Sequence, residues 1–368
     1  MHQKHPKMAR PDLGHYGHTE FALVGSTCER METIMSEWVD QLSDRYRCLM
    51  VTGEHQEHPT PASLRYGRKR FTPSTDAWNE YDDRLTGADY DLVLVNGNHY
   101  PAARQIVFVD EQKAGTLERR REQLTDIYAI VHVNGPASMP EWLREQAKNQ
   151  HCPPITTSIS LLKPVLVGLE RVLSDRVAPL RALILAGGAS SRMGTDKAHL
   201  VYRDGRSEVE RLYELCTSAG APVSISVRDD AQTGKYPAPV ITDRFLGLGP
   251  AGAICSAFLD DPNSAWLVLA CDLPLLDEAT IKQLIDARAP GRYATALRGP
   301  EREWPEPLVA IYEPRAYQRL LRFMALGYSC PRKMLINSEI ALVNLDDMLP
   351  LTNANTPEER DRIQAIFR

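Results

Sequence analysis

The chain has 368 residues, of which 43% are hydrophobic and 25% charged, and its formal net charge at pH 7 is −5. This length exceeds what one hydrophobic core usually holds, so we expect two domains. The slightly acidic balance argues against nucleic acid or an anionic membrane surface as the main partner.

The cysteines and the first residues bear on the compartment. Seven cysteines are scattered without a CxxC pair, which argues against a disulfide framework or a zinc cluster and fits a reducing compartment. The start of the chain, MHQKHPKMARPD, has no apolar segment of the signal-peptide kind, and no apolar run approaches the length of a membrane span. We therefore expect a cytoplasmic protein with no membrane partner.

The first half of the chain alternates short apolar runs with helical patterns. Such alternation predicts parallel βαβ units, and hence an α/β domain over residues 1–173. The polar segment 55–75, rich in proline and arginine, is predicted to be a loop. Strands are expected at residues 21–25, 48–53, 91–97, 105–110 and 127–133, and helices at residues 29–45, 116–125, 139–149 and 160–173.

The second half alternates in the same way after a change of composition. Residues 174–180 are predicted to be a linker, and the apolar run RALILAGG then opens a second α/β domain over residues 181–368. Each domain is expected to be a mostly parallel sheet flanked by helices, which binds ligands beyond the carboxyl ends of its strands. Strands of the second domain are expected at residues 182–186, 221–227, 239–243, 265–272, 293–297, 307–312 and 340–345.

A glycine-rich turn, LAGGASSRMGTDK at residues 185–197, follows the first strand of the second domain. Its glycines let the backbone approach a ligand closely, and successive free amides form an anion-binding nest. Arg192 and Lys197 add positive charge beside that nest, as a triphosphate requires. The alternative is a tight strand-to-helix turn with solvated basic residues. The pattern is neither a Walker A loop nor a GxGxxG fingerprint.

The pattern LAGGxSxRMGxDK closely resembles the signature loop of molybdenum cofactor guanylyltransferases, a family of Rossmann-like fold among the nucleotidyltransferases. The resemblance covers nearly all of residues 181–368. It implies an enzyme that uses Mg²⁺ to transfer GMP from GTP to molybdopterin, whose terminal phosphate attacks the α-phosphate as pyrophosphate departs. Relatives that transfer cytidylyl groups generally carry LAAG in this turn, so the pair Gly187-Gly188 favours guanine.

The same resemblance assigns roles within the turn. Arg192 and Lys197 are expected to hold the triphosphate and to act in catalysis together with Asp272. No protein nucleophile is needed, because such transfers depend on positioning and charge neutralisation. The guanine is expected to be recognised by the backbone of Leu185, Ala186, Gly187 and Gly188.

Two aspartates at predicted strand ends match further elements of the family. Asp272 lies in CDLP, and the family's CDxP aspartate holds the magnesium ion. One carboxylate suffices for this role, because magnesium binds one or two carboxylates together with substrate phosphates. Asp243 lies in ITDRFLGLGPAG, which resembles PDxxPGxGP, an element whose aspartate contacts the nucleotide. Thr242 and Leu246 depart from that pattern. A capping or turn role stays open for Asp243, as does a turn role for Asp272.

Near the end of the chain, LTNANTPEER carries two amides, Asn353 and Asn355, with the spacing of the family's NxNTPE motif. The resemblance places them on the pterin or phosphate side of the site. Thr356, followed by proline and two glutamates, also predicts an ordinary helix start with Thr356 as N-cap, and the two interpretations are compatible.

Other positions depart from the family or add to it. Val227 stands where many members carry the asparagine of an SxNR-like stretch, and Glu306 replaces the glutamine of QPL. Arg332 and Lys333 either face the phosphate of the pterin substrate or are solvated charges.

The N-terminal domain resembles, more distantly, the GTP-binding adaptor protein of molybdopterin-guanine dinucleotide biosynthesis, through FALVGSTCERMET, DLVLVNGNHYPAARQIVFVD and IYAIVHVNG. Arg30, Met31 and Glu32 stand where that family's P-loop reads GKT, and NGN replaces its EG. Without the lysine, tight triphosphate binding is disfavoured, so we predict a degenerate P-loop-like domain that docks a cofactor-supplying protein or a molybdoenzyme. No metal site is assigned to three histidines, whose spacing matches no standard ligand set: His55, His58 and His99.

Other functions fit parts of the same pattern. Within enzymes, the alternatives are cytidylyl transfer to the same pterin and nucleotidyl transfer to a sugar phosphate. The alternative from a different functional class is a non-catalytic nucleotide-binding scaffold in cofactor delivery. Retention of Lys197, Asp243 and Asp272 argues against the scaffold, which needs no metal-binding carboxylate.

Overall fold

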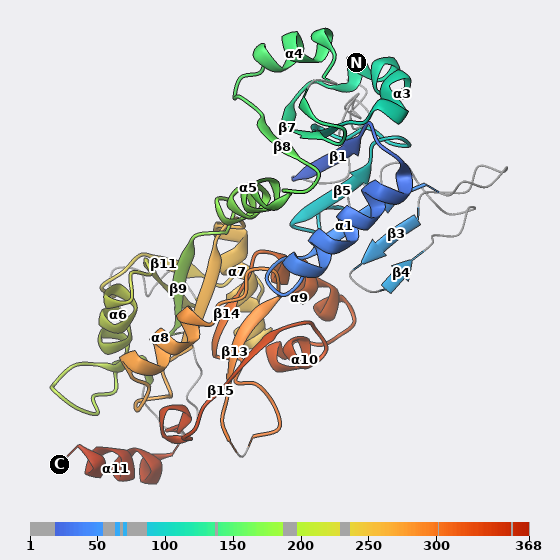
Figure 1. The fold of residues 1–368 in the computed structure, drawn as a ribbon. Helices are drawn as coiled ribbons and strands as arrows, with labels where there is room; N and C mark the ends of the chain where they lie inside the picture. Colours follow the sequence, from blue (N-terminus) through green and yellow to red (C-terminus); the bar gives the residue numbers. More distant parts are fainter. Residues whose placement is uncertain are drawn as a thin grey trace, which may run out of the picture. The chain divides into compact units, whose positions relative to one another are not determined.

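The chain divides into two compact units, Met1–Val177 and Ala178–Arg368, each built on a sheet of its own (Figure 1). Each unit has its own hydrophobic core. No described helix is long and apolar enough to cross a membrane. The computed structural model describes residues 19–53, 63–66, 69–71, 87–136, 139–186, 197–228, 236–300, 302–354 and 356–367.

The N-terminal unit contains an eight-stranded sheet. Its strands are β1 Glu20–Val24, β2 Cys48–Thr52, β3 Ser63–Tyr66, β4 Lys69–Phe71, β5 Leu92–Asn96, β6 Arg104–Val109, β7 Ile127–His132 and β8 Ile155–Ser158. The strand order is β4-β3-β2-β5-β1-β6-β7-β8, and all neighbours pair in parallel except β3, which is antiparallel to both β2 and β4. Most of these strands are continuous apolar runs, as parallel strands buried on both faces require.

Helices cover both faces of this sheet. They are α1 Cys28–Leu42, α3 Ala114–Arg119, α4 Glu141–Lys148 and α5 Lys163–Ser174, with short 3₁₀ helices η1 Glu111–Lys113 and η2 Arg121–Gln123. Successive residues of β1 divide between the faces: Phe21 and Leu23 pack with α1 and α5, whereas Val24 packs with α3 and α4. Helix α1 begins after its N-cap Thr27, whose side chain accepts a hydrogen bond from the N–H of Arg30.

The prediction of a loop at residues 55–75 is wrong within the described part of that segment. There β3 and β4 extend the sheet as an antiparallel pair, with Tyr66 opposite Leu49 of β2. Short strands at the edge of a sheet tolerate charged residues, so the basic residues of this segment do not exclude a strand. The other predicted strands and helices of this unit are confirmed, with shifts of a few residues at their ends.

The C-terminal unit contains a seven-stranded sheet. Its strands are β9 Leu180–Leu185, β10 Val223–Val227, β11 Val240–Thr242, β12 Ala265–Ala270, β13 Ala294–Arg298, β14 Val309–Tyr312 and β15 Ala341–Asn344. In the order β11-β10-β9-β12-β14-β13-β15, β14 is the strand that runs against its neighbours. All these strands lie where the sequence predicts them. Both units are mostly parallel sheets flanked by helices, so the predicted α/β fold class is confirmed.

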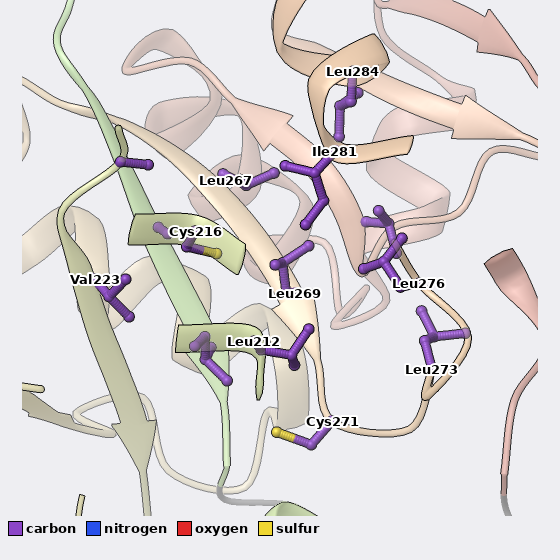
Figure 2. Packing of buried hydrophobic residues seen from close by; sticks show 14 of the residues in the cluster. Leu212, Cys216, Val223, Leu267, Leu269, Cys271, Leu273, Leu276, Ile281 and Leu284 are labelled. Atoms are coloured by element: carbon purple, nitrogen blue, oxygen red, sulfur yellow. The ribbon is translucent and has the colours of Figure 1, made fainter. Parts of the chain in front are cut away.

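The helices of this unit again form a layer on each face of the sheet (Figure 1). They are α6 Glu208–Ser218, α7 Gly249–Asp260, α8 Glu278–Asp286, α9 Arg315–Ala325, α10 Pro331–Ile336 and α11 Pro357–Ile366, with η4 Lys197–His199 and η6 Leu349–Leu351. Figure 2 shows Leu212 of α6 and Ile281 of α8 packed onto Leu267 and Leu269 of β12. Trp266, the neighbouring residue of β12, packs on the opposite face with α7, α9 and α10.

Candidate active site

Predicted site residues of the C-terminal unit gather at one edge of its sheet: Leu185, Ala186, Asp243, Asp272 and Asn353. β9, β10, β11 and β12 are parallel, so their carboxyl ends share this edge, termed here the strand-end edge. β14 runs the other way and begins there: the N–H of Ala270, at the end of β12, donates to the carbonyl oxygen of Leu308 at 3.2 Å. Open α/β sheets bind ligands at edges of this kind.

The glycine-rich turn leaves the sheet at the strand-end edge. Leu185 is the last residue of β9, and the buried Ala186 donates its N–H to the carbonyl oxygen of Ser226 in β10 at 3.0 Å. This bond fixes the point from which the turn departs. Lys197 is the first residue of η4, but its side chain lies outside the description. Three further predicted site residues lie outside the described residues: Gly187, Gly188 and Arg192.

Asp243 directly follows β11 at the strand-end edge and is held by β10. Its N–H donates to the carbonyl oxygen of Val227 at 2.8 Å, and its Oδ1 accepts a hydrogen bond from the hydroxyl of Ser226 at 3.0 Å. Burial raises the pKa of Asp243, while the Ser226 hydroxyl and the positive charge of Arg228 act in the opposite direction. Val227, which departs from the family pattern, thus contributes its backbone to the position of this carboxylate.

The turn between Asp243 and α7 depends on glycines. Gly247 and Gly249 have φ angles of +75° and +56°, in the left-handed region that favours glycine. A Cβ at Gly252 would lie 2.4 Å from the carbonyl oxygen of Phe245, so the first turn of α7 packs on this segment only without a side chain there. The backbone of the turn is therefore free to line a binding site.

Asp272 lies just beyond the end of β12 and is half-buried. Its carbonyl oxygen accepts a hydrogen bond from the N–H of Ala354 at 2.8 Å, which brings the C-terminal NxNTPE segment to this aspartate. Burial is the largest cause of the raised pKa values of Tyr202 and Glu208, and the negative charge of Asp272 raises both further. Asp272 is therefore close to both side chains.

A buried ion pair supports the segment that follows Asp272. Arg211 of α6 donates to both carboxylate oxygens of Glu208, at 2.9 and 2.5 Å. The same guanidinium donates to the carbonyl oxygens of Leu276 and Leu273, at 2.6 and 3.3 Å. Removal of either charged partner would leave a buried charge uncompensated, so the pair fixes this turn. It was not predicted, and its only local signal is a Glu and an Arg three residues apart on α6.

A cavity of about 540 Å³ lies at the strand-end edge, where β14 begins. Four segments that are distant in the sequence line it: residues 247–250, 306–308 and 329–332, and Asn353. The cavity thus joins the turn after Asp243 to the predicted pterin-side asparagine.

The NxNTPE segment both reaches this cavity and begins α11. Thr356 is the N-cap, as predicted: its Oγ1 accepts a hydrogen bond from the N–H of Glu359 at 3.2 Å, and the Glu359 carboxylate accepts one from the N–H of Thr356 at 3.1 Å. Oδ1 of Asn353 is buried and has no hydrogen-bond partner among the described residues, which suits a group that binds a ligand. Asn355 lies outside the described residues.

Glu306, which lines the cavity, pairs with two arginines. Its buried carboxylate accepts hydrogen bonds from Nη1 of Arg302 at 2.9 Å and from Nη2 of Arg332 at 3.4 Å. The glutamine usual in the family is neutral and would not form these ion pairs. Of the two basic residues singled out in the sequence, Arg332 lines the cavity, whereas Lys333 lies with its Nζ 4.6 Å from the centroid of the Tyr328 ring.

Asp272 is the residue that the sequence assigns to a magnesium ion. Within the described ranges, no group of three or more His, Cys, Asp or Glu side chains could hold a metal ion. A magnesium ion held by one carboxylate and substrate phosphates needs no such group, and Asp272 at a strand end fits that arrangement. Of the histidines in the N-terminal unit, His55 and His58 lie outside the described residues, and His99 contacts Cys28.

The three residues at the P-loop position of the N-terminal unit make internal contacts. Met31 is fully buried in the core. Nη1 of Arg30 donates to Oδ2 of Asp110 at 2.5 Å, and the carboxylate of Glu32 accepts a hydrogen bond from Nδ2 of Asn96 at 2.8 Å. These contacts occupy the side chains, and the loss of triphosphate binding by this loop stays a prediction.

The C-terminal unit has relatives among known proteins. Residues 182–340 match the MobA-like NTP transferase domain. A probable molybdenum cofactor guanylyltransferase of Carboxydothermus hydrogenoformans is 31% identical over 198 residues, which are 51% of this chain and 96% of that protein. A molybdenum cofactor biosynthesis bifunctional protein of Synechocystis sp. is 31% identical over 187 residues, 50% of this chain, and the match spans only 54% of that relative's length.

A solved structure resembles the same half of the chain. Molybdopterin-guanine dinucleotide biosynthesis protein A from Archaeoglobus fulgidus is 22% identical with a TM-score of 0.44, over 50% of this chain and 97% of that chain. The segment that matches the MobA-like domain contains Lys197, Asp243 and Asp272 and no residue of the N-terminal unit. The resemblance of the N-terminal unit to an adaptor protein therefore stays a prediction.

Replacement of Ser226 by alanine is expected to raise the pKa of Asp243 further. The serine hydroxyl stabilises the ionised carboxylate, whereas burial favours the protonated form, so loss of this hydrogen bond leaves the effect of burial less opposed. NMR titration of the carboxyl carbon measures the change. Ser224→Ala in the same strand, whose hydroxyl accepts from Arg181, is the control and should leave the titration unchanged. An unchanged or lowered pKa in Ser226→Ala would contradict this account.

Proposed function

This chain belongs to the molybdenum cofactor guanylyltransferase family, and from that premise we propose that its C-terminal unit transfers GMP from GTP to molybdopterin and releases pyrophosphate. One observation carries the proposal. The start of the glycine-rich turn, the carboxylates Asp243 and Asp272, and a cavity of about 540 Å³ lined by Asn353 all lie at the same strand-end edge. This edge has the parts needed to bind a nucleotide and an acceptor side by side.

The nucleotide side is formed by the turn and by Asp243. The backbone of residues 185–188 recognises guanine, and the amides of the turn form a nest for the triphosphate. Arg192 and Lys197 neutralise the phosphate charge. Asp243, held in place by the Ser226 hydroxyl, accepts a hydrogen bond from the nucleotide.

Asp272 supplies the carboxylate for magnesium. Its strand, β12, lies between β9, which carries the turn, and β14, which begins at the cavity. Asp272 would hold the magnesium ion, which when bound would supply positive charge to the substrate phosphates. The ion pair of Arg211 and Glu208 holds the segment after Asp272, so the carboxylate keeps its position when the charged substrates arrive.

The acceptor side is the cavity. Arg332, oriented by Glu306, provides a guanidinium for the phosphate of the pterin, and Oδ1 of Asn353 accepts a hydrogen bond from a donor on the substrate. The chain then acts by holding the acceptor phosphate in line with the α-phosphate of GTP, since phosphoryl and nucleotidyl transfer depend mainly on positioning and charge. Docking of a partner protein by the N-terminal unit stays a prediction.

With saturating molybdopterin, the full chain is expected to turn over GTP faster than CTP, ATP or UTP. The reason is the Gly187-Gly188 pair, where relatives that transfer cytidylyl groups carry an alanine. Mass spectrometry of the dinucleotide formed from each nucleotide measures the preference. A preference for CTP would overturn the guanine assignment and leave the transfer chemistry intact, whereas no dinucleotide with any nucleotide would favour a non-catalytic scaffold.

Asp272→Asn is expected to lower Mg²⁺ affinity and rate together. The change keeps the shape of the side chain and removes its charge, and loss of one such electrostatic element typically costs roughly 10²–10³ in rate. Turnover against Mg²⁺ concentration is the measurement. The matched control is Asp286→Asn on the exposed side of α8, which should keep the full rate. Near-normal activity of Asp272→Asn at low Mg²⁺ would place the metal elsewhere.

Arg332→Gln is expected to raise the KM for molybdopterin about tenfold, because a charge-assisted hydrogen bond to the acceptor phosphate is lost. The KM for GTP should not change, since the arginine lines the cavity that we assign to the acceptor. Lys333→Gln is the matched control, because its side chain packs on Tyr328. Equal effects of the two substitutions on both KM values would show that Arg332 acts only through surface charge.

A further inference from the structure

The N-terminal unit brings a thiol and an imidazole into contact. Sγ of Cys28 lies 3.4 Å from Nε2 of His99, although the two residues are 71 positions apart. Cys28 is the first residue of α1, after β1, and His99 follows β5, so both lie at the carboxyl-end edge of this parallel sheet. We propose that Cys28 and His99 form a nucleophilic site that undergoes thiol–disulfide exchange with small disulfide compounds.

A helix N-terminus and a side-chain donor lie beside the Cys28 sulfur. The first N–H groups of a helix lack intrahelical partners and carry partial positive charge, and Cys28 begins a helix of 15 residues. Nδ2 of Asn98 donates to Sγ at 3.6 Å. The guanidinium of Arg120 donates to the carbonyl oxygen of Asn98, the residue whose side chain donates to the sulfur. Reactive cysteines typically occupy such half-exposed, electropositive places.

Two asparagine amides fix the geometry around the sulfur. Oδ1 of Asn96 accepts hydrogen bonds from the N–H of Asn98 at 3.1 Å and from the Cys28 thiol at 3.9 Å, while its Nδ2 donates to Glu32 at 2.8 Å. Nδ2 of Asn98 also donates to the carbonyl oxygen of Ser26 at 2.8 Å. Because a flip of either amide would set oxygen against oxygen, Asn98 keeps its donor toward the sulfur. The Glu32 carboxylate is engaged by Asn96.

Gly53, just after β2, leaves room for the imidazole. A Cβ at Gly53 would lie 2.6 Å from Cγ and 2.7 Å from Nδ1 of His99, so the ring packs directly on the backbone there. This packing positions Nε2 against Cys28. A substitution at Gly53 therefore displaces the ring without removing it.

The other cysteines favour a small molecule as the exchange partner. Cys48 begins β2 and Cys152 precedes β8, so both lie toward the opposite edge of the sheet and cannot resolve a disulfide formed at Cys28. The product is then a mixed disulfide that no other cysteine of the N-terminal unit resolves. Four cysteines are buried, Cys48, Cys216, Cys255 and Cys271, and two are exposed, Cys152 and Cys330.

The reaction balances without a further reagent. Sγ of Cys28 attacks one sulfur of R–S–S–R′ as its proton passes to Nε2 of His99. The S–S bond breaks, and the leaving sulfur takes that proton from His99, which gives Cys28–S–S–R and R′–SH. The Cys28 sulfur is oxidised and the R′ sulfur is reduced.

The test measures reaction of the folded full chain with dithiobis(nitrobenzoate) and with oxidised glutathione. Release of the coloured thiolate should show one fast thiol per chain, and peptide mapping should place the glutathione adduct on Cys28 before the exposed Cys152 and Cys330. The fast phase should be absent in Cys28→Ser. If Cys28 reacts no faster than the two exposed cysteines, the proposal fails.

Variants with Cys152 and Cys330 changed to serine isolate the role of the imidazole. His99→Gln should slow the reaction of Cys28 roughly 10²-fold, the usual lower range for loss of a general base. Gly53→Ala, which displaces the ring, should slow it in the same direction.

His151→Gln, at an exposed histidine of the same unit, is the matched control and should leave the rate unchanged. An unchanged rate in His99→Gln, with circular dichroism showing a folded chain, would overturn the proposal. If that variant does not fold, Gly53→Ala and the comparison among the cysteines of the unaltered chain still decide the outcome.

Discussion

Burial of both faces of the two sheets confines the reactive side chains of this chain to the ends of strands. A mostly parallel sheet is covered by helices on both sides, so its strands are apolar along their length. Asp243 and Asp272 follow β11 and β12 directly, because a carboxylate within either strand would be enclosed by apolar side chains. The shared direction of these strands then brings both aspartates to one edge.

Buried carboxylates, each held by arginine, stiffen that edge. Glu208 and Arg211 tie α6 to the segment after Asp272, and Glu306 in the wall of the cavity binds Arg302 and Arg332. Such pairs contribute little net stability, but loss of one partner costs a great deal, since the remaining charge stays buried. Their effect here is to fix the positions of the segment after Asp272 and of the Arg332 side chain. Nucleotidyl transfer depends on such positioning.

The N-terminal unit also has polar side chains at the carboxyl-end edge of its sheet, but here they are a thiol and an imidazole. The segment between β1 and α1 resembles a P-loop in sequence, but Arg30 is paired with Asp110 and Met31 lies in the core. The first residue of α1 is a cysteine, Cys28. The N-terminus of a helix favours a bound anion. At the N-terminus of α1, the Cys28 sulfur lies beside the His99 imidazole.

The sequence by itself determined the features that lie within one continuous segment. Apolar periodicity predicted most strands of both units. It missed β3 and β4, whose basic residues at a sheet edge imitate a loop, and β8, whose sequence ITTS is not an apolar run. The motifs around Leu185, Asp272 and Asn353 were recognisable because their spacing is local.

Only the tertiary structure decided which segments meet. Arg211 reaches carbonyl oxygens 62 and 65 residues away, Glu306 meets Arg332 across 26 residues, and Cys28 meets His99 across 71. No local pattern encodes these distances. They follow from strand order and direction, because the backbone pairing of strands distant in the sequence sets which loops emerge side by side at the edge.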